Sequence, residues 1–540
     1  MPAACESGRQ GAGGKGGLLP AAALLGGCTM LSRLLGLARD AVMAWLLGAG
    51  PVADALTAAM RLPHMARRML AEGSLSMSLT AQLARRGNRR EAAALRRALA
   101  RRLGGVLLAG ACLLGFCADP LLRLLAPGLD LSGGGTDAGL PGQLFRLCLP
   151  YIPAAGLAGL CMAVLHARRH FLIPALSPLL FNICVLAAAG VAVCWCSGQA
   201  DTARALALGM SGGGLAQWLL QRLAVERLPG DGAGAARLAA SPARRAAISR
   251  RAWRLLAGLP GGILGAAAPQ LAMLAAMCPA SLAGPGHMAS LYYAERLLEL
   301  PLGLVGACLG MASLPRLSEC AREGQWEEFA RLRGLALRWA VRLSLPAAVG
   351  LAVVSRPLVT CLLGHGAFDA NAIHWTAWAV LAYAPCLPAC AVSRCLLAAC
   401  HARGERRRAV WAGLFVPLFT LGAGLLFLSA GELGGVGAAA AASLALCLQT
   451  LLLAPGRVTV PGAHTSQWRN AVRFCCGQLA AAALVGLAAW AALCLTEGLA
   501  TGLRLALAVA AGALAWPCGL WLVRDEAWRS LRQGFRRRQS

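Results

Sequence analysis

Residues 32–79 read SRLLGLARDAVMAWLLGAGPVADALTAAMRLPHMARRMLAEGSLSMSL. Two apolar segments, 18–47 and 52–80, meet here at the turn sequence GAGP, and each of them carries charged residues. About 20 consecutive, mainly apolar residues span a bilayer as a helix. Charged side chains inside such a helix usually face a partner or a water-filled cavity. The stretch therefore predicts two transmembrane helices that turn charges toward the protein interior.

The rest of the chain has the same apolar character. Of its 540 residues, 58% are hydrophobic and 14% are charged, whereas soluble domains carry about 25% charged residues. This composition excludes ordinary soluble, disordered and collagen-like proteins, and it predicts an all-α polytopic membrane protein with about fourteen transmembrane helices. Beyond the first two, the helices are expected at 103–118, 143–165, 171–197, 203–221, 255–278, 288–315, 339–355, 373–399, 409–430, 434–455, 474–496 and 501–523.

Basic residues determine the predicted orientation. Lys and Arg number 51 against 23 Asp and Glu, which gives a net charge of +28. Of the basic residues, 38 lie in the two tails and one set of alternate connections, and four lie in the opposite set or in the first turns of the helices that follow it. Cytoplasmic loops carry such an excess, so both termini are expected in the cytoplasm. The bilayer accounts for the charge, and no nucleic-acid partner is expected.

The N-terminal apolar segment allows two interpretations. LLPAAALLGGC, residues 18–28, ends in a sequence that resembles a lipoprotein cleavage box, which would place an acyl group on Cys28. The apolar stretch, however, continues past Cys28 to residue 47. This continuation favours a first transmembrane helix over a cleaved signal.

The first two helices concentrate charge. Arg33 and Asp40 are seven residues apart, and Asp54, Arg61 and Arg68 repeat this spacing, which returns to nearly the same face of a helix. Together the two helices hold five arginines and three carboxylates, an excess of two positive charges. Such a lining suits a dianion or an anionic headgroup.

A second charged cluster, Glu295, Arg296 and Glu299, lies in the segment YYAERLLELP. Arg296 and Glu299 are spaced i,i+3 and can pair on one helix face. The cluster is therefore either a further part of the charged lining or a self-neutralising ion pair.

A weak internal repeat predicts two lobes. LPYIPAAGLAGLCMAVLHARRHF at 149–171 resembles LAYAPCLPACAVSRCLLAACHARGE at 381–405, and structural repeats in transporters typically flank a central substrate site. We expect an N-terminal lobe at 1–225 with helices 1–6, a basic cytoplasmic connection at 226–254, a C-terminal lobe at 255–455 with helices 7–12, and helices 13 and 14 with a basic cytoplasmic tail at 456–540.

Three motifs resemble those of a known family. The stretch 32–79 is similar to the signature region of the MurJ (MviN) lipid II flippases, whose superfamily includes the MATE exporters and the polysaccharide flippases. YYAERLLELPLGLVGACLGMASLPRLS at 292–318 resembles the eighth helix of the family, and LLGHGAF at 362–368 resembles a later motif. The resemblance implies a transporter of the bacterial cytoplasmic (inner) membrane that performs no covalent chemistry.

The same resemblance implies a substrate and a site. The substrate would be the undecaprenyl-pyrophosphate-linked peptidoglycan precursor, moved from the cytoplasmic to the periplasmic leaflet by alternating access, with the tail against helices 13 and 14. The planar guanidinium group of arginine can donate two parallel hydrogen bonds to phosphate oxygens. The essential cavity charges of the family correspond here to Arg33, Arg39, Asp40, Asp54, Arg67, Arg68, Glu72 and Arg296, with Glu299 as a further candidate.

Cofactors and other partners follow less directly. No cofactor is expected, and the histidines show no metal-ligand spacing. Some family members are thought to bind sodium among helices 7, 11 and 12, but the segment 255–278 has no carboxylate, so the sequence does not favour a sodium site. The membrane potential is a candidate energy source. Membrane lipids and the cell-wall synthesis machinery are candidate partners.

Three rival functions make different demands on the sequence. A polysaccharide flippase of the O-antigen type fits the charges equally well and differs only in the motifs. A MATE-like exporter of organic cations would favour carboxylates and aromatic residues, whereas aromatic residues make up 5% of this chain. An enzyme acting on polyprenyl phosphate would need a reactive loop, and the sequence contains no HExxH, GxSxG or DxD in a loop.

The charge asymmetry predicts the topology. Single cysteines introduced at Asp130 or Glu432 of a cysteine-free variant should react with an impermeant thiol reagent added outside the cell. Cysteines at Gly87 or Gly234 should be protected until the membrane is permeabilised. Strong labelling of the position 87 cysteine in intact cells would contradict the predicted orientation.

Overall fold

A computed structural model describes residues 15–70, 89–129, 139–168, 170–228, 241–257, 268–431, 433–454 and 464–523, and within these ranges every regular element is a helix. The four positions of the topology prediction, Gly87, Asp130, Gly234 and Glu432, lie outside the described residues. The expected all-helical fold is confirmed.

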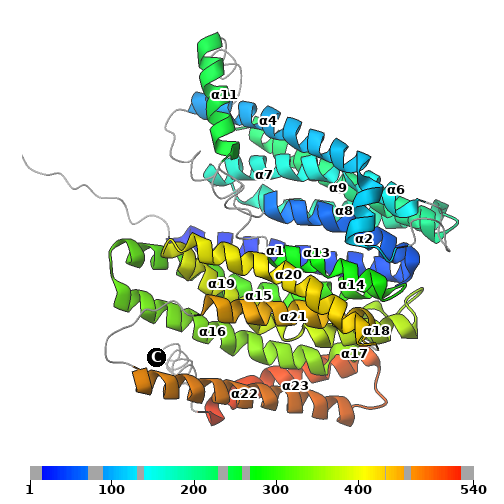
Figure 1. Cartoon of the computed structure of the whole chain (residues 1–540), viewed down its shortest axis with the longest axis vertical. Helices are drawn as coiled ribbons and strands as arrows, with labels where there is room; N and C mark the ends of the chain where they lie inside the picture. The colour runs from blue at the N-terminus through cyan, green and yellow to red at the C-terminus, as the bar shows by residue number, and fades with distance from the viewer. Residues whose placement is uncertain are drawn as a thin grey trace, which may run out of the picture.

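The helices before residue 258 form one group. They are α1 (Lys15–Leu47), α2 (Pro51–Leu70), α4 (Arg89–Phe116), α5 (Ala118–Leu125), α6 (Leu140–Cys148), α7 (Tyr151–Ala167), α8 (Leu172–Trp195), α9 (Gln199–Glu226) and α11 (Pro242–Ala257). In Figure 1 most of them lie in the upper part of the molecule, where α8 packs against α9 and α7 packs against α4.

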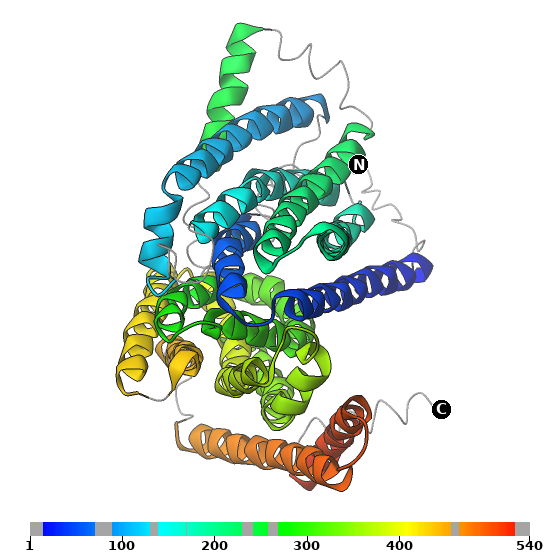
Figure 2. The same ribbon diagram turned by 90° about the vertical axis from the view of Figure 1, so that its right-hand side faces the viewer.

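The second group starts at residue 268. It comprises α13 (Ala268–Ala275), α14 (Met277–Leu282), α15 (His287–Arg322), α16 (Trp326–Val353), α17 (Ser355–Leu363), α18 (Ala370–Tyr383), α19 (Cys386–Ala402), α20 (Arg406–Ser429) and α21 (Gly434–Leu453). A last pair, α22 (His464–Leu495) and α23 (Thr501–Leu522), packs along α16 and α17 and lies at one side of the molecule in Figure 2. The expected domain boundaries at 225, 254 and 455 stay predictions.

Nine membrane-spanning candidates occur within the described ranges. By length and composition, these spans are formed by α4, α6 with α7, α8, α16, α18 with α19, α20, α21, α22 and α23. The count of fourteen stays a prediction. Two expected spans, 143–165 and 373–399, are interrupted near Pro150 and Pro385, because proline lacks the backbone N–H that continues a helix. Both copies of the sequence repeat contain one of these interruptions.

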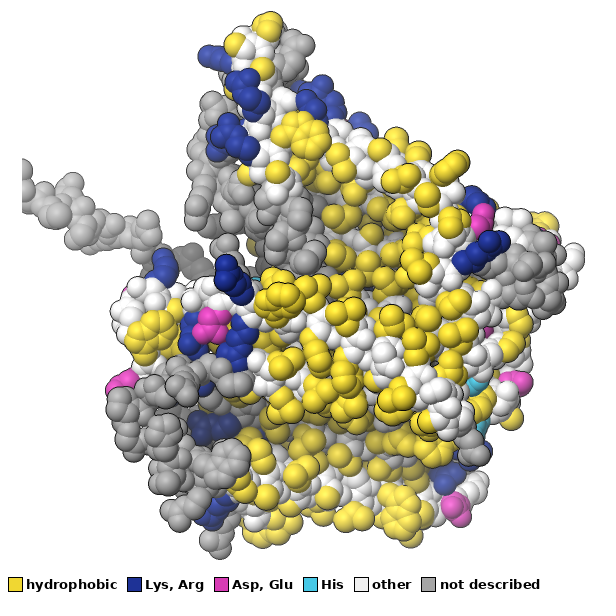
Figure 3. Space-filling model, in the orientation of Figure 1, with side chains coloured by type: hydrophobic (Ala, Val, Ile, Leu, Met, Phe, Trp, Pro, Cys, Tyr) yellow, Lys and Arg dark blue, Asp and Glu magenta, His cyan; other side chains and the backbone are white. Residues whose placement is uncertain are grey.

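The outer surface is apolar. Large hydrophobic side chains are exposed on α4, α8, α20, α22 and α23, and Figure 3 shows hydrophobic side chains over much of the visible face. In water such a surface would be unstable, whereas acyl chains solvate it. The buried helices instead use small residues: α21 begins GGVGAAAAAS, and small residues allow close approach between helices in a bilayer.

The two groups meet through the turn between α1 and α2. Gly48 (φ +64°) lies against the carbonyl of Ala367, and Gly286 (φ +87°) lies against the carbonyl of Ala49. The Ala367 N–H also donates to the Trp45 carbonyl at 2.9 Å. Positive φ and close backbone approach both favour glycine at these positions. The contact lies at the end of the helices that the charge pattern assigns to the periplasm.

Gly286→Ala should therefore destabilise this contact. A left-handed conformation costs a non-glycine residue about 1–2 kcal/mol, and the new Cβ would also collide with the Ala49 carbonyl. Gly139→Ala is the matched control, because Gly139 has φ +82° and an added Cβ would meet nothing within 4 Å. The midpoint of thermal unfolding in detergent should fall further for Gly286→Ala. Equal losses would show that the contact adds nothing beyond backbone strain.

Candidate functional site

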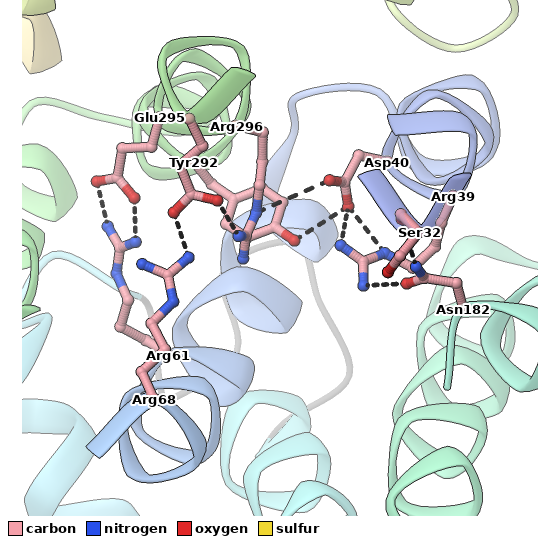
Figure 4. Close-up of polar contacts among 10 residues, drawn as sticks. Ser32, Arg39, Asp40, Arg61, Arg68, Asn182, Tyr292, Glu295 and Arg296 are labelled. Carbon is pink, nitrogen blue, oxygen red and sulfur yellow. Dashed lines mark hydrogen bonds and ion pairs between the residues drawn. The ribbon is translucent and has the colours of Figure 1, made fainter. Parts of the chain in front are cut away.

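Charged residues of α1, α2 and α15 come together between the two groups of helices (Figure 4). On α15, Tyr292, Glu295, Arg296 and Glu299 follow the helical i, i+3, i+4, i+7 pattern and so share one face. This face meets the face of α2 that carries Arg61 and Arg68. Residues about 230 positions apart in the sequence thereby become partners.

Arg39 of α1 binds Asp40 on the same helix and Asn182 on α8. Its Nε and Nη2 atoms donate to Asp40 Oδ1 at 3.0 and 2.7 Å, and Nη1 donates to Asn182 Oδ1 at 3.1 Å. Asn182 in turn donates from Nδ2 to the carbonyl of Ser32 at 3.0 Å. Arg39 is 8% exposed and Asp40 is 3% exposed. Burial with several hydrogen bonds gives this arginine a fixed position.

Arg61 forms a two-pronged ion pair with Glu295. Arg61 Nη2 donates to Glu295 Oε1 at 2.8 Å, and Nη1 contacts the other carboxylate oxygen. The Tyr383 hydroxyl, on α18, donates to Oε1 at 3.1 Å. A buried carboxylate is stable only when it is paired and hydrogen-bonded. Glu295 is therefore satisfied by α2 and α18 together.

Arg296 lies at the centre of a chain of charges. Its Nη1 donates to Glu299 Oε2 at 3.0 Å, its Nε is 3.8 Å from Asp40 Oδ2, and its guanidinium lies 4.7 Å from the Tyr292 ring centroid. Glu299 also pairs with Arg68. The Tyr292 hydroxyl donates to Asp40 Oδ1 at 3.2 Å. The chain Asp40–Arg296–Glu299–Arg68 connects α1, α15 and α2.

Asp54 has a different kind of partner. Its Oδ2 accepts the Gly286 N–H at 2.6 Å and its Oδ1 accepts the Ala289 N–H at 2.7 Å. These amides belong to the first turn of α15, where unpaired N–H groups and the helix dipole favour an anion. Asp54 of α2 therefore caps a helix of the other group, beside the glycine contact.

Arg33 differs from the other arginines of the site. Its guanidinium lies against Gly303 of α15 and is partly exposed. Within the described part of the chain it has no hydrogen bond or ion pair to a side chain. Arg33 is thus the arginine of the described cluster that an incoming anion can approach without displacing a carboxylate.

The cluster carries an excess of positive charge in this conformation. Its described members are five arginines and three carboxylates, which leaves an excess of two positive charges. The arginines are Arg33, Arg39, Arg61, Arg68 and Arg296, and the carboxylates are Asp40, Glu295 and Glu299. A cavity beside Arg61 and Tyr292 has a volume of about 10 Å³, space for about one water. Around Arg61 the charges contact one another and leave little free volume.

The structure brings together most of the residues that the sequence analysis selected. Arg39, Asp40, Arg68, Arg296 and Glu299 form the connected network, and Asp54 lies apart at the start of α15. Glu72 lies outside the described residues. Sequence reasoning did not select Asn182, Tyr292 and Tyr383, or the Arg61–Glu295 pair, as site residues. A seven-residue spacing does mark Arg61, but it cannot identify its partner.

The sequence matches a known family over most of its length. Residues 43–509 match the family described as Lipid II flippase MurJ. A probable lipid II flippase MurJ of Haemophilus influenzae is 30% identical over 484 residues, 86% of this chain and 90% of that protein. A probable lipid II flippase MurJ of Rhizobium meliloti is 31% identical over 403 residues, 73% of each chain.

Solved structures share the fold. A lipid II flippase MurJ in an inward closed conformation has a TM-score of 0.71 at 19% identity, over 94% of this chain and 99% of that one. An inward-facing multidrug resistance MATE family transporter has a TM-score of 0.59 at 18% identity, over 80% of this chain and 96% of that one.

Asp54→Ala should loosen the attachment of α15 to α2. Loss of a capping side chain costs about 1 kcal/mol, so amide exchange at Gly286 and Ala289 should accelerate about fivefold in hydrogen-exchange mass spectrometry. Asp369→Ala is the matched control, because Asp369 caps α18 by accepting the Ala372 N–H at 2.7 Å within one group. Unchanged exchange at 286–289 in Asp54→Ala would contradict the capping role.

Proposed function

Because this chain belongs to the MurJ family of lipid II flippases, we propose that it moves the lipid-linked peptidoglycan precursor from the cytoplasmic to the periplasmic leaflet. It is a multi-pass membrane transporter and not an enzyme. The observation that carries the proposal is the arginine-rich cluster between the two groups of helices. A pyrophosphate headgroup needs a polar, cationic environment within the bilayer, whereas a polyprenyl tail is soluble in lipid.

The contacts of the cluster support a mechanism of partner exchange. A buried ion pair that loses one member costs about 3–5 kcal/mol, so Arg68 and Arg296 cannot simply release Glu299. Phosphate oxygens can replace the carboxylate oxygens around these guanidinium groups with similar geometry. Arg33 offers the first contact, and the paired arginines follow as the headgroup enters. The cost of opening the pairs is then offset by the substrate itself.

Alternating access is the second part of the proposal. The Asp54 cap and the Gly48 and Gly286 contacts join the two groups at the end assigned to the periplasm. Opening toward the periplasm must therefore break the cap, while opening toward the cytoplasm can leave it intact. Rocking of one lobe against the other around a fixed central site accounts for both states.

The last helices offer a place for the tail. The pair α22 and α23 exposes Leu479, Leu487 and Leu514 and packs on α16 and α17. A polyprenyl chain could lie along such an apolar surface while its headgroup passes through the polar site. This assignment follows the family resemblance, and the exposed leucines support it.

We further propose the membrane potential as the energy source, without a sodium ion. Moving one elementary charge across 100 mV is worth about 2.3 kcal/mol. An inside-negative potential therefore favours outward movement of an anionic headgroup. Cell-wall synthesis enzymes are candidate partners because they consume the translocated precursor. The basic connections and tails support an orientation with both termini in the cytoplasm.

The two arginines of α1 give a matched test of the site. Arg33→Ala should abolish flipping and leave thermal stability near wild type, because Arg33 has no described ion-pair partner. Arg39→Ala should lower stability, because it removes three hydrogen bonds from Asp40 and Asn182. Arg33→Lys should also fail if a planar fork is required. Flipping is measured by growth and by periplasmic exposure of lipid II in bacteria depleted of their own flippase.

Two outcomes would contradict these assignments. If Arg33→Ala lowers both abundance and stability, and Asp40→Asn restores flipping to it, then Arg33 is a structural residue and not a headgroup contact. If the wild-type chain is inserted in the membrane but rescues neither growth nor lipid II exposure, while it restores O-antigen export in a second strain, the substrate is a polysaccharide precursor.

A further inference from the structure

A groove outside the central site lies where α11 crosses the start of α4. In Figures 1 and 2, α11 extends past the start of α4, away from the other helices. The two helices contact each other directly, and Ala252 and Ile248 of α11 pack with Leu95 and Leu99 of α4. The apolar side of α11 therefore packs on α4, and side chains of both helices line the groove between them.

The groove has the size of a lipid headgroup and a basic lining. Its volume is about 550 Å³, and its lining comprises Ala94, Ala98, Arg101, Arg102, Pro242, Ala246, Ile248 and Ser249. Small side chains create the space, two arginines supply the charge, and no carboxylate belongs to the described lining. Five more arginines and no acidic residue occur in the sequence of α11, and Figure 3 shows basic side chains gathered over this region.

Arg102 is held in place and has no carboxylate partner among the described residues. Its Nη2 donates to the Ser249 hydroxyl at 2.6 Å, and its guanidinium lies 5.3 Å from the Trp253 ring centroid. Both partners are uncharged, so the full positive charge remains available. Arg222 makes a similar contact with Trp218 at 5.4 Å, but its Nε also donates to Glu226 at 2.8 Å. Arg222 is therefore paired with a carboxylate, whereas the described partners of Arg102 are uncharged.

The face of α4 below the groove is apolar and exposed. Leu108, Leu113 and Phe116 follow Arg101 and Arg102 along the helix at spacings that return to nearly the same side, and they are 58%, 65% and 86% exposed. A molecule with an anionic head in the groove could therefore lay acyl chains along α4. Along α4 the basic residues come first and the apolar surface follows, which matches a phospholipid with its anionic headgroup at one end and its acyl chains at the other.

We propose that the groove between α4 and α11 is a binding site for one anionic phospholipid, with the phosphodiester between Arg101 and Arg102 and the acyl chains against α4. Basic residues near an anionic membrane surface contribute about 1 kcal/mol each. Arg101 and Arg102 directly precede the apolar stretch of α4 that ends at Phe116, so a membrane span that begins after them leaves both arginines near the lipid headgroups. The proposal does not depend on the substrate of the central site.

The test measures lipid binding to the purified full chain by native mass spectrometry, with phosphatidylglycerol and phosphatidylcholine as probes. The wild type should bind phosphatidylglycerol more tightly. Arg101→Ala with Arg102→Ala should weaken phosphatidylglycerol binding about thirtyfold and leave phosphatidylcholine binding unchanged. Arg222→Ala should leave both unchanged. Equal weakening by Arg222→Ala, or full retention by the double variant, would overturn the proposal.

A second variant separates the groove from general surface charge. Ala246→Trp keeps every arginine but fills the groove, and it should abolish the preference for phosphatidylglycerol. Retained preference in this variant would place the lipid elsewhere. Glycerol 3-phosphate should not displace bound phosphatidylglycerol at millimolar concentration. Efficient displacement would show that the groove takes a soluble phosphate ester and that the lipid assignment is wrong.

Discussion

Five arginine side chains of the described residues lie where α1, α2 and α15 meet, within a protein whose outer surface is apolar. A charge in such a position is tolerated only if a partner or a polar cavity compensates it, and this requirement organises the centre of the molecule. Arg39 is satisfied by Asp40 and Asn182, Arg61 by Glu295, and Arg68 by Glu299. Because most of these partners lie on different helices, the compensation of charge also determines how the helices pack.

The same contacts connect the two groups of helices. Glu295 and Glu299 belong to α15, whereas Arg61 and Arg68, with which they pair, belong to α2. A change in the relative position of the groups must therefore separate charges or exchange their partners. An anionic substrate can supply the replacement oxygens, and this links binding to movement through simple electrostatics. Arg33, which needs no such exchange, is suited to the initial contact.

Much of the fold could be predicted from the sequence, because apolar length and the position of basic residues depend on local composition alone. The seven-residue spacing of Arg61 and Arg68 on α2 and the charged residues on α15 belong to helix faces that meet in the structure, while their role in substrate binding stays a prediction. The partners could not be predicted. Asp54 binds backbone amides of Gly286 and Ala289, which leave no trace in the side-chain pattern. Asn182 and Tyr383 are polar residues within mainly apolar segments, and only the packing of α8 and α18 brings them to Arg39 and Glu295.

The glycine contact at Gly48 and Gly286 has a consequence for how often the protein can cycle. At these two positions the groups touch mainly through main-chain atoms, with the carbonyls of Ala367 and Ala49 as neighbours. When this contact opens, it exposes backbone amide groups, which form hydrogen bonds with water. A contact made of leucine side chains would instead expose apolar surface to water on opening, and this would favour the closed state. A contact between main-chain atoms can therefore open and close repeatedly at a small cost in hydration free energy.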